Sequence, residues 1–256
     1  MTEKYFIRFK ADDYEGYGCL IDSKAYPVKG DIFSDYEIVE RPFAIETIMY
    51  LPPCQPQKII CVGLNYADHA DESTLAKIPE EPLIFFKPLS SLIGHQDNIV
   101  KPGWVDRVDY EGEIAAIIGK KMRYVSVEEA DASVFGYTCV NDVTARNIQK
   151  KDNQWTRGKG FDTFCPIGPW IVKGLDASAL DIQTRLNGQV VQKSNTSLMM
   201  KSPGEVISFV SKVMTLYPGD IISTGTPKGV GPVKAGDVIE IEIQNIGTLR
   251  NSVIDE

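Results

Sequence analysis

The feature that most constrains the fold of this 256-residue chain is a succession of short strand-like runs separated by glycine and proline turns. After residue 57 these runs are Lys58–Val62, Leu83–Lys87, Glu113–Ile118, Phe135–Asn141, Trp170–Lys173, Ile182–Leu186, Asp220–Ser223 and Val238–Ile243. Helical character is expected over 127–132 and over 203–216, where Ser202 is a candidate N-cap, Pro203 takes the first helical position and Glu205 the third. The pattern predicts a mixed, mainly β fold, built as a barrel or a sandwich with few helices.

The start of the chain predicts a small separate β unit. Two strand-like runs, 5–9 and 17–21, lie on either side of turn residues, which is typical of a hairpin. The stretch LPPCQPQ, residues 51–57, then holds three prolines in seven residues and predicts an extended linker. We therefore expect a small N-terminal β domain with its linker over residues 1–55 and the main domain over residues 56–256.

Composition narrows the class of protein. The net charge is −8 and no Lys/Arg block outweighs the acids, which argues against a nucleic-acid partner. Five cysteines with irregular spacing and no C-x-x-C pair indicate reduced thiols. The first residues are charged, and no apolar stretch approaches the ~18 residues that a membrane span needs. We expect a cytoplasmic protein without a membrane partner.

An acidic motif stands directly before one of the apolar strands. Glu111 and Glu113 alternate in an extended segment, so both carboxylates are expected on one face. Such a pair is common on a solvated strand edge, but like charges held this close also favour a bound cation. Asp142 ends the apolar run 134–140, and although acids are common turn formers, it offers a third carboxylate. Three acids at the mouths of two strands would make an oxygen-only site for Mg²⁺ or Mn²⁺, and no Cys/His pairing favours zinc.

One of the chain's two histidines lies in the polar stretch GLNYADHADE, residues 63–72. His69 and Glu72 share a face if this stretch forms a helical turn, and a carboxylate beside an imidazole creates a general base that works near neutral pH. The alternative is an exposed pair of little consequence. The polar composition predicts a lid that becomes ordered around substrate and metal. The other histidine, His95, has no acid at helical spacing and is assigned a structural role.

Several segments together resemble the fumarylacetoacetate hydrolase family. In chain order they are VGLNYADHADE (62–72), FFKP (85–88), SLIG (91–94), DYEGEIAAIIGK (109–120), VNDVTARNIQ (140–149), RGKGFDTFCPIGPW (157–170) and GDIISTGTPKGVGPV (219–233). The resemblance covers residues 56 to about 254. It implies the β-rich fold of that family and a metal-dependent enzyme that cleaves, decarboxylates or isomerises small 2-oxo or enol diacids, commonly as a homodimer.

The resemblance also assigns roles to residues. It places Glu111, Glu113 and Asp142 on the metal ligands, and His69 with Glu72 on the catalytic pair. The positions that contact substrate or its oxyanion are Arg146, Gln149, Lys159 and Thr226, with Lys87 and Thr163 as weaker correspondences. Lys159 stands between two glycines, and we expect it and Arg146 to stabilise negative charge as an oxyanion hole does. The stretch STGTPKGVG lacks the spacing of a phosphate loop, so its glycines are expected to form a turn that brings Thr226 near the metal.

The residues do not separate three reactions that share an enolate intermediate. Our leading hypothesis is a Mg²⁺- or Mn²⁺-dependent enzyme for small 2-oxo dicarboxylates or acylpyruvates, which decarboxylates oxaloacetate or hydrolyses an acylpyruvate or fumarylpyruvate. An alternative is isomerisation of 2-hydroxyhepta-2,4-diene-1,7-dioate in aromatic catabolism. A regulatory binding protein on the same fold is a third hypothesis, against which the complete set of ligand and catalytic positions argues.

Overall fold

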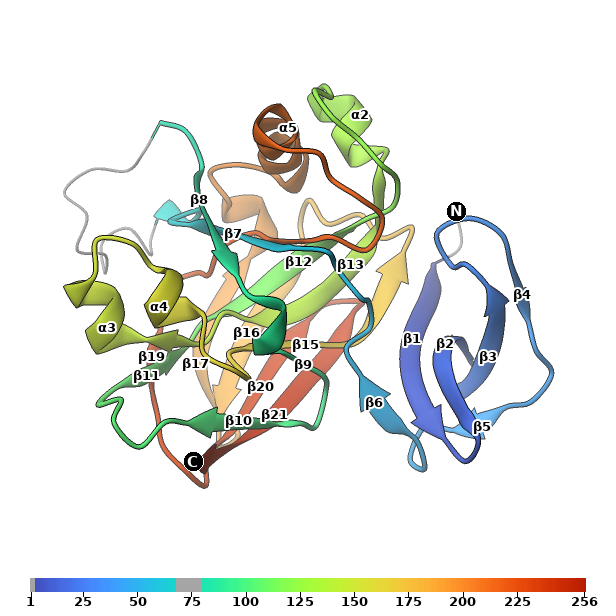
Figure 1. The fold of residues 1–256 in the computed structure, drawn as a ribbon, viewed down its shortest axis with the longest axis horizontal. Helices are drawn as coiled ribbons and strands as arrows, with labels where there is room; N and C mark the ends of the chain where they lie inside the picture. Colours follow the sequence, from blue (N-terminus) through green and yellow to red (C-terminus); the bar gives the residue numbers. More distant parts are fainter. Residues whose placement is uncertain (1–2, 68–79) are drawn as a thin grey trace.

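Thirteen strands form the largest sheet of a computed structural model, which describes residues 3–67 and 80–256 (Figure 1). The main path of this sheet runs through β4 (Tyr36–Ile38), β3 (Lys24–Gly30), β2 (Tyr14–Ile21), β1 (Lys4–Ala11), β15 (Cys165–Lys173), β13 (Val134–Asn141), β12 (Gly112–Ile118), β18 (Ile221–Ser223), β7 (Ile59–Gly63) and β8 (Leu83–Lys87). Three further strands pair with members of this path: β5 (Phe43–Ala44), β6 (Met49–Leu51) and β9 (Leu92–Ile93).

Two smaller sheets complete the β structure of the described residues. A five-stranded sheet has the order β10 (Asn98–Lys101), β21 (Gly247–Asp255), β20 (Val238–Ile243), β16 (Asp181–Leu186) and β17 (Gln189–Asn195). A three-stranded sheet has the order β14 (Thr144–Ala145), β11 (Val108–Tyr110) and β19 (Gly231–Val233). The expected mainly β fold is therefore confirmed, and it takes the form of separate sheets.

Helices are few and short in the described part of the chain. They are α2 (Val127–Asp131), α3 (Arg146–Lys151), α4 (Thr156–Lys159) and α5 (Pro203–Val213), with 3-10 turns η1 (Leu89–Ser91) and η2 (Thr196–Leu198). None of the helices within residues 3–67 and 80–256 is long and apolar enough to cross a membrane.

The helix expected over 203–216 begins as predicted and ends earlier. The hydroxyl of Ser202 accepts the Glu205 backbone N–H, and the Glu205 carboxylate accepts the Ser202 N–H, which makes a reciprocal cap. Met214 is already extended, because Leu216 beyond it exchanges backbone hydrogen bonds with Met122. The early end of α5 is thus caused by a tertiary contact, which helix propensity alone does not predict.

The predicted N-terminal hairpin is present, and it continues the main sheet. Strands β1 and β2 are antiparallel, with Phe6 opposite Cys19. The other edge of β1 pairs with β15, where Phe6 lies opposite Ile171. The N-terminal strands, blue in Figure 1, therefore extend the sheet, and a domain boundary at residue 55 stays a prediction.

The central strand β12 is buried on both faces, which explains its uninterrupted apolar sequence. Ile114 and Ala116 belong to a core cluster that includes residues of β16, β20, β21 and α5. Ala115 and Ile117 belong to a second cluster on the opposite face, with residues of β7, β15 and β18. The cysteines are free buried thiols, as the irregular spacing predicted. A strand fixed on both faces gives the acids at its start a rigid support.

Candidate active site

The register of two central strands brings the acidic residues together. Gly112 of β12 lies opposite Asn141 of β13, so the residues just beyond this pair, Glu111 and Asp142, are neighbours. The Asp142 backbone N–H donates to the Glu111 carbonyl at 2.9 Å, and the Glu111 N–H donates to the Asn141 side-chain oxygen at 2.9 Å. The two acids are therefore fixed through their backbones before any ligand binds.

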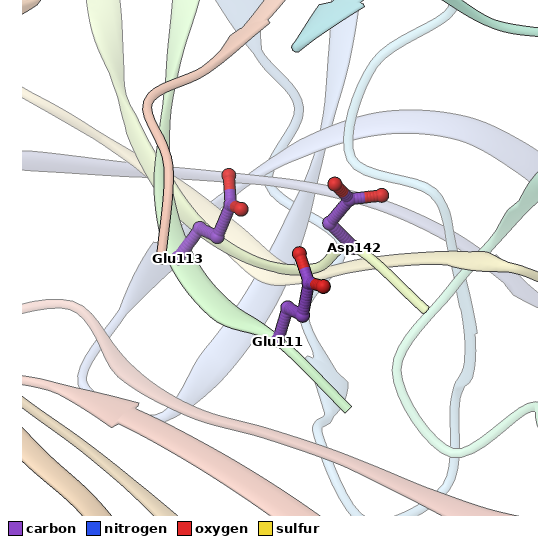
Figure 2. A group of neighbouring side chains, drawn as sticks. All are labelled: Glu111, Glu113 and Asp142. Carbon is purple, nitrogen blue, oxygen red and sulfur yellow. The ribbon is translucent and has the colours of Figure 1, made fainter. Parts of the chain in front are cut away.

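Three carboxylates form one buried cluster. Oxygen atoms of Glu111, Glu113 and Asp142 lie within 4.8 Å of one another, and Figure 2 shows the three side chains directed toward a common space. All three residues are buried. Burial, together with the carboxylates of Asp142 and Glu111, raises the pKa of Glu113 to about 8. Without a bound cation, the neutral form of Glu113 is therefore favoured at neutral pH.

Glu113 is positioned by the turn after β18. Its Oε2 atom accepts hydrogen bonds from the Ser223 hydroxyl and from the Gly225 backbone N–H, the latter at 2.9 Å. Gly225 has a φ of 96°, a conformation that side-chain-bearing residues rarely adopt. The next residue, Thr226, lines the cavity and donates from its hydroxyl to the Gly112 carbonyl at 2.9 Å. The glycine turn therefore brings Thr226 beside the acids, as expected from the sequence.

Two buried lysines contact the acidic cluster. Lys87 Nζ, at the end of β8, lies 2.6 Å from Asp142 Oδ1. Lys159 Nζ, at the end of α4, lies 2.6 Å from Asp142 Oδ2 and 2.8 Å from Glu111 Oε2. Burial by itself lowers the pKa of Lys159, but the two carboxylates outweigh it and the pKa is raised. Lys159 is therefore an ammonium group near neutral pH and a donor of protons in hydrogen bonds.

Arg146 connects the cluster to the wall of the cavity. Its Nε donates to Asp109 at 2.8 Å, its Nη1 to Gln149 at 2.6 Å, and its Nη2 to Glu111. These contacts depend on α3, which starts at Arg146 and places Gln149 one turn later. Neither α3 nor α4 was predicted, because each is too short to show a helical period of apolar residues.

The three acids line a cavity of about 400 Å³ together with Arg146 and Lys159. Lys87, predicted to contact substrate, is not among the lining residues and reaches the site only through Asp142. The lining of this cavity also includes residues that the sequence had not indicated: Arg107, Asp109, Lys150, Asn153 and Trp155. The Trp155 ring stacks edge-on against Phe85 at 5.3 Å between centroids, beside the Lys159 ammonium. Asp109 and Trp155 lie within or next to the motifs that carry the family resemblance, so those motifs were the available signal.

Of the other predicted residues, Thr163 and His95 are described and do not line the cavity. The Thr163 hydroxyl accepts the Val100 backbone N–H at 2.9 Å. His69, Glu72 and the lid proposed around them fall outside the described residues. His95 accepts the Arg250 backbone N–H through Nδ1 at 3.0 Å and packs edge-on against Tyr50, which agrees with a structural role.

The donor set fits a hard divalent cation. All three ligand candidates are carboxylates, and their oxygens are close enough to share one ion. The Lys159 ammonium already bridges Glu111 and Asp142, which shows that this space stabilises positive charge. The fold and the site therefore define the class of protein: a mainly β protein with a buried carboxylate cluster that suits a divalent ion and is flanked by cationic side chains.

Comparison with known proteins supplies the family. Residues 58–254 match the family described as Fumarylacetoacetate (FAA) hydrolase C-terminal, and the chain belongs to the fumarylacetoacetate hydrolase family. It is 45% identical over 221 residues to the oxaloacetate tautomerase FAHD2A, mitochondrial, of Bos taurus, a match that covers 82% of this chain and 70% of the relative.

Two solved structures are similar along nearly the whole chain. The 2-hydroxyhepta-2,4-diene-1,7-dioate isomerase from Mycobacterium marinum aligns with a TM-score of 0.93 and 38% identity over 99% of both chains. The maleylpyruvate hydrolase from Sphingobium sp. SYK-6, solved in complex with manganese(II) ion and pyruvate, aligns with a TM-score of 0.80 and 30% identity over 98% of this chain and 99% of the other. The family resemblance seen in the sequence is thus confirmed.

Proposed function

We propose that this protein is a divalent-metal-dependent enzyme that breaks a C–C bond of a small 2-oxo dicarboxylic acid or acylpyruvate, and that an enolate forms as this bond breaks. Decarboxylation of oxaloacetate and hydrolysis of an acylpyruvate are the leading reactions. The observation that carries the proposal is the convergence of Glu111, Glu113 and Asp142 within 4.8 Å in a cavity that also holds Lys159 and Arg146.

Glu111, Glu113 and Asp142 would hold Mg²⁺ or Mn²⁺. When bound, the ion supplies a Lewis acid for the carboxylate and carbonyl oxygens of a 2-oxo acid. The manganese and pyruvate in the maleylpyruvate hydrolase structure support this ligand chemistry. Both cations accept oxygen ligands, so measured affinities are needed to show which of the two the protein prefers.

Lys159 and Arg146 would stabilise the charge that develops on the substrate. The raised pKa of Lys159 keeps a proton on its amine, so it acts as a hydrogen-bond donor and not as the base. Arg146 is oriented by Asp109 and Gln149, which leaves it little freedom to reorganise during the reaction. Proton transfer is assigned to His69 and Glu72, on the strength of the family motif alone.

The second candidate is isomerisation of 2-hydroxyhepta-2,4-diene-1,7-dioate. It is favoured by the alignment with an isomerase of that name over 99% of both chains. The Bos taurus relative carries the name of an oxaloacetate tautomerase, a reaction that likewise moves a proton through an enol. The same charged groups would stabilise the enolate in each of these reactions. Assays with different substrates are therefore needed to distinguish the reactions.

A panel assay tests the proposal. Oxaloacetate, acetylpyruvate, fumarylpyruvate and the heptadienedioate are each incubated with Mg²⁺, with Mn²⁺ and with a chelator. We expect turnover of at least one 2-oxo acid that the chelator abolishes and either ion restores. Absence of metal-dependent turnover on the whole panel would contradict the proposal and favour a regulatory binding protein.

A homodimer in the cytoplasm is also proposed, as the family resemblance implies. Light scattering coupled to gel filtration tests the oligomeric state, with a mass of twice 28.4 kDa as the expected result. A mass of one chain would contradict it.

A further inference from the structure

We propose that Arg107, held against Asp109 and assisted by Lys150, forms a second carboxylate subsite at the outer end of the cavity. This subsite would make the enzyme select 2-oxo diacids over 2-oxo monoacids of equal length. The inference rests on the proposed function, and it deepens that function by naming the residue that sets the substrate class.

Arg107 lies beside Arg146 in the wall of the cavity. The Arg107 carbonyl accepts the Arg146 backbone N–H at 2.8 Å, where β11 and β14 pair. Its guanidinium makes two bonds to Asp109, from Nε at 2.7 Å and from Nη2 at 3.0 Å. The side chain is 48% exposed, and it lines the cavity. Asp109 therefore fixes a solvent-facing guanidinium whose Nη1 group has no partner in the described part of the chain.

Asp109 cannot neutralise both arginines that it contacts. Its carboxylate is fully buried and accepts from Arg107 and also from Arg146, whose Nε lies 2.8 Å away. Glu111 is a second partner of Arg146, so the two arginines are balanced by two carboxylates. Lys150 adds a positive charge to this wall, since it is exposed, lines the cavity and makes no ion pair with a described residue. The neighbouring Asp152 offers little compensation, because Arg157 takes both of its carboxylate oxygens.

The acids and cations in mutual contact balance before a metal ion is added. Four acids, Asp109, Glu111, Glu113 and Asp142, carry four negative charges when ionised. Four cations, Lys87, Lys159, Arg107 and Arg146, contact them. The cavity is also lined by Asp152, whose charge Arg157 offsets, and by Lys150. A divalent cation would therefore leave an excess of at least two positive charges, and a diacid offsets more of this excess than a monoacid.

The cations around the site differ in how exposed they are. Lys87 and Lys159 are each 2% exposed and lie at the acidic cluster, whereas Arg107 is half exposed and Lys150 lies at the surface. The 2-oxo acid end of a substrate belongs with the inner group, where the metal ligands are. The outer guanidinium then lies where a distal carboxylate would emerge, and its forked donors match that carboxylate.

Matched ligand pairs test this subsite without relying on turnover. Dissociation constants of 2-oxoglutarate and 2-oxovalerate, and of 2-oxoadipate and 2-oxohexanoate, are measured by calorimetry with Mn²⁺ present. Each pair differs only in a distal carboxylate. We expect the wild type to prefer each diacid by about tenfold or more, and Arg107→Gln to weaken the diacids by about 10- to 100-fold while the monoacids change less than about twofold.

Two variants control for other causes. Arg107→Lys keeps the charge without the forked donors and should recover part of the preference for diacids. Arg41→Gln removes an arginine of matched exposure, 49%, that is also paired with an aspartate but is not among the cavity-lining residues, and it should leave all constants unchanged. Equal losses on both members of a pair, or no loss on the diacid, would overturn the subsite.

Oxalate separates failure of this inference from failure of the proposed function. Oxalate carries the head group of a 2-oxo acid without a distal arm, so it should bind wild type and Arg107→Gln equally in the presence of Mn²⁺. If oxalate binds and the wild type shows no preference for diacids, the subsite is wrong and the metal site stands. If oxalate fails to bind the wild type, the metal-dependent function itself is contradicted.

Discussion

Gly112 lies opposite Asn141 in the antiparallel pair of β12 and β13, and this register makes Glu111 and Asp142 neighbours from separate strands. Their backbones exchange a hydrogen bond of 2.9 Å, so their side chains project from a rigid joint. A slip by one residue would turn the side chains of one strand to the other face and separate the acids. The chemistry proposed for this protein thus depends on strand register as much as on the identity of the acids.

The affinity for Mg²⁺ should rise with pH. The pKa of Glu113 is raised to about 8, so below that pH the ion-free protein holds a proton that the ion must displace. We expect the association constant to increase by up to about tenfold per pH unit below pH 8 and to level off above it. Calorimetry between pH 6 and 9 measures this slope. Glu113→Gln should bind more weakly and without that slope, and a flat wild-type profile would contradict the assignment.

Loss of Lys159 should separate turnover from metal binding. Lys159→Met removes the ammonium that contacts Glu111 and Asp142 and that would stabilise the enolate. We expect kcat to fall by about 100-fold or more. Affinity for Mn²⁺ should be retained or raised, because a competing positive charge has been removed. Simultaneous loss of metal binding would instead show that Lys159 is needed to fold the site.

Replacement of His69 should abolish turnover. In His69→Ala the proposed general base is missing, and a loss of about 100-fold or more in kcat is expected. The dissociation constant for Mn²⁺ should stay near the wild-type value, since the histidine is not a predicted ligand. If metal binding collapsed as well, the residue would have to be reassigned as a ligand or as a determinant of the fold.

Because of His95, we expect the free energy of unfolding to depend on pH. Burial, with a smaller contribution from the charge of Arg250, lowers the pKa of His95 to about 4, and Nδ1 must stay unprotonated to accept the Arg250 N–H. The group is neutral in the folded state and takes up a proton more readily when unfolded. Its contribution is therefore complete above about pH 6.5 and is lost as the pH falls toward 4.

Denaturant unfolding at several pH values checks the prediction for His95. Wild type should lose stability between pH 6.5 and 4. In His95→Asn the side-chain oxygen can accept the same N–H without a titration, so the decline over this window should be shallower. Identical slopes for the two proteins would exclude His95 as the source.

The sequence predicted the limits of some strands and missed others. The runs 83–87 and 238–243 are strands with the predicted limits. The central strand β15 begins at Cys165, five residues before the predicted run. The strands 189–195 and 247–255 were missed because polar and glycine residues interrupt their apolar pattern. Each forms a hairpin with the strand before it, and the turn Asn187-Gly188 between β16 and β17 was a local signal that the prediction did not use.

The acids of the candidate site were also accessible from the sequence, and their partners were not. Alternation placed Glu111 and Glu113 on one face, and the end of an apolar run marked Asp142. Arg107 carries no comparable signal, because its significance lies in a shared contact with Asp109 and in its place on the cavity wall. For Thr163 the family motif predicted a contact with substrate. In the structure its hydroxyl instead accepts the backbone N–H of Val100.

Anomalous diffraction from a crystal soaked in Mn²⁺ shows whether the three acids share one ion. We expect a single strong peak at the manganese edge, with carboxylate oxygens of Glu111, Glu113 and Asp142 at about 2.1 to 2.3 Å from it. A map with no peak among these three residues, or with manganese bound elsewhere while Lys87 and Lys159 keep their contacts with the acids, would contradict this expectation.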